Sequence, residues 1–211
     1  MTIQASDIIQ SVRQRLRQKT EAESNWDDSD ILIYLSDAIE EVCRDTECFR
    51  TWVKYVANGT SKFPLPSNLI KPIGEPTSTQ GPVPWLTATD INPGNELPLD
   101  LLLIAPNFGA KILGEFIYFL PAPTDPRYLH YYGWPDIPIT DPSDSIPLPR
   151  TVRMPLIYST CFHMASEVGK ADRAPTFWTL YQDALVKAAS AAAATQKAGP
   201  NQVRRPKMRG R

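Results

Sequence analysis

The chain has 211 residues, with 22 basic and 23 acidic side chains and a formal net charge of −1. Its hydrophobic fraction of 42% and charged fraction of 21% are ordinary for a globular protein, which excludes disorder throughout. No run of 18 apolar residues occurs, and the N-terminus lacks the basic and apolar regions of a signal peptide. We therefore expect neither a membrane span nor a signal peptide. The three cysteines, Cys43, Cys48 and Cys161, fit free buried thiols in a reducing cytoplasm.

Proline divides the chain into three parts. Of the 21 prolines, none precedes Pro64 and 18 fall between Pro64 and Pro155. A proline-rich middle between two helix-permitting ends predicts an α+β fold, with a bundle of about four helices and a β insertion of hairpins. We predict one domain over residues 1–199, with the β-rich insertion at 50–148, followed by an extended arm over 200–211.

Two helices are predicted before the insertion, at residues 2–19 and 27–47. Ile9, Val12 and Leu16 lie on one face of the first helix. Asp27 is the predicted N-cap of the second helix. The second helix has a wide apolar stripe, formed by Ile31, Tyr34, Leu35, Ala38, Ile39 and Val42.

Strands are predicted within the insertion. Residues 51–56 and 60–63 flank Asn58-Gly59 and predict a hairpin. Residues 66–106 are predicted to be loop-like, with short apolar pieces at 69–70 and 99–104. Residues 111–120 predict a single strand, which would form a second hairpin with a strand at 128–134 across a proline-rich turn.

Two helices are predicted after the insertion, at residues 151–169 and 175–198. The first should bury Ile157, Cys161, Met164 and Val168. The second should turn six residues inward: Phe177, Leu180, Tyr181, Ala184, Leu185 and Ala188.

The sequence offers little for catalysis or metal binding. His130 and His163 have no neighbours at metal-ligand spacing, and no phosphate-binding or nucleophile motif occurs. Asp27, Asp28 and Asp30 could suggest a cation site, but helix capping is the favoured interpretation. We expect no enzyme activity, no cofactor and no metal, although an active site that leaves no motif stays a third hypothesis.

The end of the chain is strongly basic. Residues 197–211 carry six basic and no acidic side chains, which leaves 16 basic and 23 acidic residues in the body. The arm is basic at Arg204, Arg205, Lys207, Arg209 and Arg211. It could be a solvated end, a docking arm for a protein partner, or a tether that makes the protein bind nucleic acid. It contains no aromatic residue, which disfavours base stacking.

Several short motifs occur in an order found in one family. Trp26 to Ile39 reads W-D-D-S-D-I-L-I-Y-L-S-D-A-I, and Phe63-Pro64-Leu65-Pro66 follows it. A strand then ends in Pro-Ala-Pro at 121–123, and Tyr131-Tyr132-Gly133-Trp134-Pro135 comes next. Ile146-Pro147 leads into a helix pair whose second member carries Trp178 and Tyr181. Together these motifs resemble the head-to-tail adaptor proteins of tailed bacteriophages, of the podovirus type also called tubular tail protein A.

This resemblance implies a structural protein of the virion tail or neck, assembled in the host cytoplasm. Such adaptors form a twelve-subunit ring beneath the portal protein and extend the DNA channel. They also seat the next tail component, a nozzle or tube. The five basic arm residues would then contact the portal, and DNA would pass through the acidic body without specific binding. The alternative is a nucleic-acid-binding protein tethered by its basic tail.

Overall fold

The computed structural model describes residues 3–16, 26–86, 109–167 and 173–197, with side chains up to 191 in the last range. The chain divides into two compact units. The helical unit comprises residues 1–48 and 137–211, and the β unit comprises residues 49–136. Both helices and antiparallel sheets are present, which confirms the predicted α+β class.

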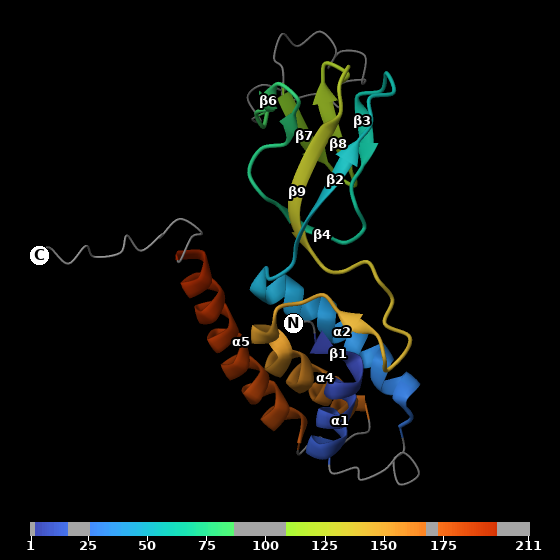
Figure 1. Cartoon of the computed structure of the whole chain (residues 1–211), viewed down its shortest axis with the longest axis vertical. Coiled ribbons are helices and arrows are strands. Elements are labelled where there is room, and N and C mark those ends of the chain that lie inside the picture. The colour runs from blue at the N-terminus through green and yellow to red at the C-terminus, as the bar shows by residue number, and fades with distance from the viewer. Residues whose placement is uncertain (1–2, 17–25, 87–108, 168–172, 198–211) are drawn as a thin grey trace, which may run out of the picture. The chain divides into compact units, whose positions relative to one another are not determined.

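The helical unit contains four α-helices and one 3-10 turn among the described residues (Figure 1). These are α1 Ala5–Leu16, α2 Asp28–Thr46, η3 Arg150–Val152, α4 Arg153–Glu167 and α5 Ala174–Lys197. Helix α4 is central, because it packs against α5, α2 and α1. A short antiparallel pair joins β1 Ile3–Gln4 to β10 Ser145–Ile146. The strand β10 lies in the stretch predicted as part of the insertion, but its pairing with β1 places it in the helical unit.

Local chemistry explains where α2 begins and ends. The Asp27 carboxylate accepts a hydrogen bond from the Asp30 amide at 2.8 Å, and Asp30 accepts one from the Asp27 amide at 3.1 Å. This capping box satisfies two of the amide groups that a helix start leaves unpaired. At the other end, Glu47 adopts a left-handed conformation and its amide donates to the Cys43 carbonyl.

The helical core is formed by the predicted apolar faces. Ile9, Val12 and Leu16 are buried on α1, and Ile157, Cys161 and Met164 are buried on α4. Val168 lies outside the described residues. The prediction that Leu180 faces inward is wrong, because this side chain remains 36% exposed on α5. The buried face of α5 is formed by Ala174, Phe177, Tyr181, Ala184 and Ala188, so Leu180 falls at its border.

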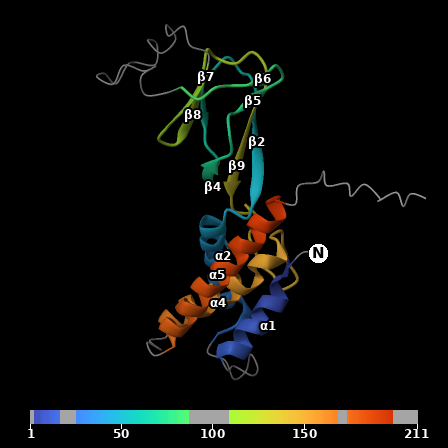
Figure 2. The ribbon, with the colours of Figure 1, turned by 90° about the vertical axis from the view of Figure 1, so that its left-hand side faces the viewer.

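The β unit contains two sheets among its described residues. Their strands are β2 Arg50–Tyr55, β3 Lys62–Pro64, β4 Leu69–Pro72, β5 Thr77–Ser78, β6 Gly81–Pro82, β7 Gly109–Leu113, β8 Phe116–Leu120 and β9 Arg127–Gly133. One sheet has the order β2-β9-β5-β6, with β4 also paired to β9 (Figure 2). The other has the order β3-β8-β7 (Figure 1).

The two sheets share one apolar core. Tyr55 of β2 and Leu129 of β9 come from the first sheet, and Phe63 and Phe119 come from the second. The rings of Tyr55, Phe63 and Phe119 lie 5.3 to 5.8 Å apart between centroids, which is a favourable aromatic spacing. The short strands are therefore held by packing between sheets as well as by pairing within them.

The predicted hairpin around Asn58-Gly59 is wrong. Gly59 has a φ of 82°, and Asn58 accepts hydrogen bonds from Thr60, so the chain does turn here. However, β2 pairs with β9 and β3 pairs with β8. Six residues separate the two strands, more than a two-residue hairpin allows, and the aromatic core lies between the strands instead of a ladder.

The single strand predicted at 111–120 is also wrong, because Gly114 and Glu115 form a turn within it. Gly114 has a φ of 59°, a conformation that glycine adopts without strain, and β7 and β8 pair across this turn. The predicted hairpin from 111 to 134 does not form, because β8 and β9 belong to different sheets. Residues 121–126 between them contain three prolines, which cannot donate to a ladder.

Candidate interaction surfaces

The residues singled out from the sequence belong to the arm that follows α5. Arg204, Arg205, Lys207, Arg209 and Arg211 all lie outside the described residues. The division into a domain over 1–199 and an arm over 200–211 stays a prediction, as does the role of the five basic residues.

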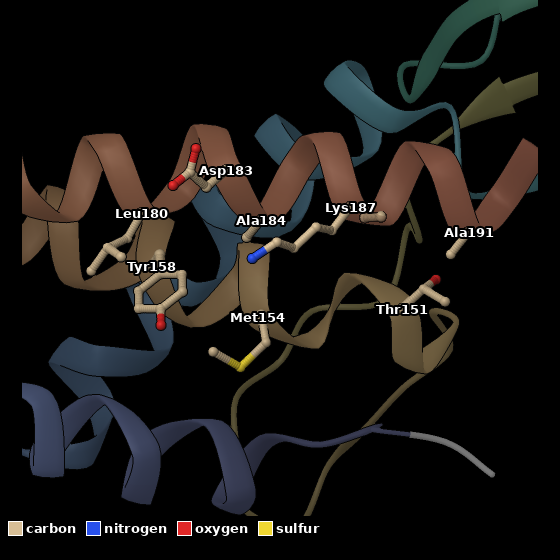
Figure 3. A pocket seen from close by; sticks show the side chains of 9 residues that line it. Thr151, Met154, Tyr158, Leu180, Asp183, Ala184, Lys187 and Ala191 are labelled. Atoms are coloured by element: carbon tan, nitrogen blue, oxygen red, sulfur yellow. The ribbon is translucent and has the colours of Figure 1, made fainter.

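A groove runs between α4 and α5 in the helical unit (Figure 3). Its volume is ≈ 370 Å³, and its lining is mostly apolar. Met154 and Tyr158 project into it from α4, and Leu180 projects from α5. Its remaining lining residues are Thr151, Asp183, Ala184, Lys187, Ala188 and Ala191. We call this surface the α4/α5 groove.

The groove arises from the spacing of side chains along α5. Phe177, Tyr181 and Ala188 form the buried face. Leu180 and Lys187 lie seven residues apart on the adjoining face, so they line the groove instead of filling it. Because Ala184, Ala188 and Ala191 have small side chains, they fill little of the space beside α4, and the groove stays open.

Charged groups mark the sides of the groove. Lys187 and Asp183 form no ion pair with any other described residue. Figure 3 shows the Lys187 side chain reaching back along α5 toward Ala184. The Arg15 guanidinium lies 5.2 Å from the centroid of the Tyr158 ring, a cation–π contact that orders this lining residue. The groove therefore combines an apolar floor with an unpaired cation and an unpaired anion.

A second surface lies on the outer face of the β unit. Trp52 is 56% exposed, and its ring lies 5.9 Å from that of Tyr128 on the neighbouring strand. The Arg50 guanidinium lies 5.1 Å from the Tyr132 ring centroid. The outward side chains of β2 and β9 are Arg50, Trp52, Lys54, Tyr128, His130 and Tyr132. We call this acid-free set the aromatic–basic face.

Polar contacts join the helices behind the groove. Ser159 on α4 donates a hydrogen bond to the Glu41 carboxylate on α2, and His163 Nε2 lies 3.1 Å from the same oxygen. The buried Tyr181 hydroxyl donates to Asp45 at 2.7 Å, which ties α5 to α2. Burial, followed by this hydrogen bond to Asp45, raises the pKa of Tyr181. The Glu41 carboxylate lies between Ser159 and His163, so it does not hold the histidine against the serine as a nucleophilic triad requires.

Two of the cysteines lie close together at the end of α2. The Cys43 and Cys48 sulfurs are 3.9 Å apart, and both thiols are free. Their contact lowers the pKa of Cys48 to about 7 and raises the pKa of Cys43, because Cys43 keeps its proton and shares it with the Cys48 sulfur. Cys161 is buried on α4, and this burial raises its pKa to about 12. The prediction of a buried thiol holds for Cys43 and Cys161, whereas Cys48 is half-buried.

The acidic cluster at the start of α2 has partners within the protein. Asp27 and Asp30 form the capping box, and Asp28 binds Arg13 at 2.6 Å. Within the described ranges, no three His, Cys, Asp or Glu side chains converge as a metal site would require. None of the described helices combines the length and hydropathy needed to cross a bilayer.

A family model described as SU10 adaptor protein matches residues 3–205. The chain belongs to the SU10 adaptor protein family. This match indicates a family of phage head-to-tail adaptors, so the chain is a structural component of the virion tail or neck. The match includes Arg204 and Arg205 of the predicted arm and ends before Lys207. No curated protein matches this adaptor.

The class of phage head-to-tail adaptors was predicted from the sequence, whereas the two surfaces were not. The α4/α5 groove could have been suspected from Leu180, which stands beside a stripe of alanines on α5. The aromatic–basic face could have been suspected from the alternation of Arg50, Trp52 and Lys54. Neither pattern reveals which side of the strand or helix is covered.

Proposed function

We propose that this adaptor forms a twelve-subunit ring that docks beneath the portal of a podovirus-type phage and extends the DNA channel. The family match over residues 3–205 is the observation that carries this proposal. The ring assembles in the host cytoplasm, and DNA passes through it without specific binding. The acidic balance of residues 1–196 suits such a conduit, because anionic walls do not hold phosphates.

The basic arm is the proposed contact with the portal. Five cations within residues 204–211 follow a helical unit whose first 48 residues carry 11 acidic and five basic side chains. A charged arm of this kind binds weakly by itself, and twelve arms in one ring gain avidity together. Binding through them should therefore depend on the assembled ring.

The β unit is the proposed seat of the next tail component, a nozzle or tube protein. Its aromatic–basic face exposes Trp52 between the cations Arg50 and Lys54. Tryptophan and arginine are enriched at protein interfaces, because they bury large areas and form several contacts. An acidic surface on the tail component would complement this face.

The test is the native mass of the protein alone and mixed with the portal, measured by mass photometry. Twelve copies of the 23.6 kDa chain would weigh about 283 kDa. A full-length variant with all five basic arm residues changed to glutamine should keep the ring and lose the portal complex. The matched control changes Lys62 and Arg150, which are exposed elsewhere, to glutamine and should bind the portal normally.

Two outcomes would contradict the proposal. A protein that stays monomeric with and without portal is not a ring subunit. A glutamine variant that binds the portal like the wild type has no docking arm. The nucleic-acid alternative has no support from the family match, and duplex DNA added at low salt in the same assay would reveal it by a salt-dependent shift.

A further inference from the structure

The outer face of α2 exposes one large apolar side chain. Ile33 is 62% exposed, although its neighbours Ile31, Leu32 and Leu35 are buried. A β-branched residue in the middle of an exposed helix face gains nothing in propensity and leaves apolar surface in water. Ile33 therefore marks this face as one to be covered.

Charged residues continue the same face at helical spacing. Asp37 follows Ile33 by four residues and forms no ion pair with a described residue. Glu40 and Arg44 complete the face and pair with each other. We call these four residues the α2 ridge. It presents an apolar knob beside an unpaired anion.

A closed ring of identical subunits needs two different surfaces on each subunit, because each copy contacts its neighbours head to tail. The helical unit carries two such surfaces. The α4/α5 groove is a hollow with the unpaired cation Lys187, and the α2 ridge is a projection with the unpaired anion Asp37. In Figure 3, α2 lies behind α4 and α5 as seen from the groove. The buried residues of α2 pack against α4, so the α2 ridge, on the opposite side of that helix, faces away from α4.

We infer that the α2 ridge of one subunit occupies the α4/α5 groove of the next, with Ile33 in the groove and Asp37 paired to Lys187. The occupant is a second copy of this chain, chosen by charge complementarity and by the opposite placement of the two surfaces. This inference rests on the proposed ring, and it names the contact that closes the ring.

The spacing of charges fixes the orientation of the contact. Ile33 and Asp37 are four residues apart, about 6 Å along a helix, and so are Ala191 and Lys187. When the two helices run antiparallel, Asp37 meets Lys187 while Ile33 lies over Ala191 beside Thr151. Glu40 and Arg44, which pair with each other, then lie on either side of the level of Asp183, so Asp37 with Lys187 is the new ion pair of the contact.

Charge exchange in the full-length protein tests this contact. Asp37→Lys alone and Lys187→Asp alone each place like charges together at every contact of the ring. Each should raise the subunit concentration needed for the ring by about tenfold or more, measured by mass photometry. The double variant Asp37→Lys/Lys187→Asp restores opposite charges and should restore the ring. Glu115→Lys, an equal reversal on an exposed turn of the β unit, is the matched control and should assemble normally.

Ile33 provides a test of the apolar part. Ile33→Asp should abolish the ring, and Ile33→Leu should preserve it, because leucine keeps the apolar volume. Circular dichroism at 222 nm on every variant checks that the helices remain formed.

The outcomes separate this inference from the proposed function. If the wild type forms a ring and the single charge reversals leave it unchanged, the ridge–groove contact is wrong and the ring stands. The contact is equally wrong if the double variant stays as defective as the single variants. If the wild type forms no ring even with portal, the proposed function and this inference fall together.

Discussion

Removing the Tyr181 hydroxyl should weaken the helical unit by a measurable amount. This side chain is fully buried on α5, and its hydroxyl donates to the exposed Asp45 carboxylate on α2 at 2.7 Å. A hydrogen bond to a charged group contributes about 1.5–3 kcal/mol to stability. Water can replace the lost donor at exposed Asp45, so we expect Tyr181→Phe to cost about 1–1.5 kcal/mol, at or just below the lower limit of that range.

Urea unfolding followed by circular dichroism at 222 nm is the appropriate assay, because all the described α-helices belong to the helical unit. With a slope of about 2 kcal/mol per molar urea, the midpoint should fall by about 0.5–0.75 M. Tyr158→Phe is the matched control, since the Tyr158 hydroxyl has no hydrogen-bond partner among the described residues. Its midpoint should change by much less.

A double-mutant cycle with Asp45→Ala isolates the pair. If the hydrogen bond acts as described, the two substitutions together should cost less than the sum of the separate costs. Additive effects, or a Tyr181→Phe midpoint equal to that of the wild type, would refute the claim that this bond ties α5 to α2.

Three further predictions concern the thiols, the β unit and alkaline pH. At pH 7.5, iodoacetamide should alkylate Cys48 well before buried Cys161, because the pKa of Cys48 is lowered to about 7 and that of Cys161 is raised to about 12. Peptide mass spectrometry measures the order of alkylation, and equal rates at the two cysteines would contradict the prediction. Gly133→Ala should destabilise the β unit by about 1–3 kcal/mol, because a Cβ at this position would lie 2.3 Å from the Asn68 carbonyl oxygen. Hydrogen exchange over residues 49–72 measures the loss of stability, and an unchanged exchange rate would disprove the prediction. The pKa of Tyr181 is raised in the folded protein, so the unfolded chain loses the hydroxyl proton at lower pH than the folded chain does. The stability that the protonated hydroxyl contributes is therefore complete below about pH 10 and declines at higher pH. Urea midpoints across pH 8–11 test this sign, and a stability that rises above pH 10 would refute the prediction.

The helices could be predicted closely because helical structure is governed by short-range chemistry. The spacing of Ile9, Val12 and Leu16 defined the buried face of α1, and Asp27 defined the start of α2 through its own hydrogen bonds. The exposure of Leu180 could not be predicted, because it depends on how far α5 is rotated against α4.

Strand partners could not be predicted in the same way. The Asn58-Gly59 turn and the strands beside it were recognised, yet β2 and β3 pair with strands more than 50 residues away. A turn motif controls only the few residues around it, whereas pairing depends on which aromatic side chains meet in the core. Tyr55, Phe63 and Phe119 meet there from three different strands.

The sequence by itself determined the fold class, the helix faces, the resemblance to head-to-tail adaptors and the charge contrast between the acidic body and the basic end. Each of these follows from composition, local periodicity or short motifs. Only the tertiary structure decided which strands pair, that α4 and α5 leave a groove, and that Ile33 and Lys187 stay uncovered within one chain. These properties depend on contacts between residues far apart in sequence, and no local pattern of side chains specifies such contacts.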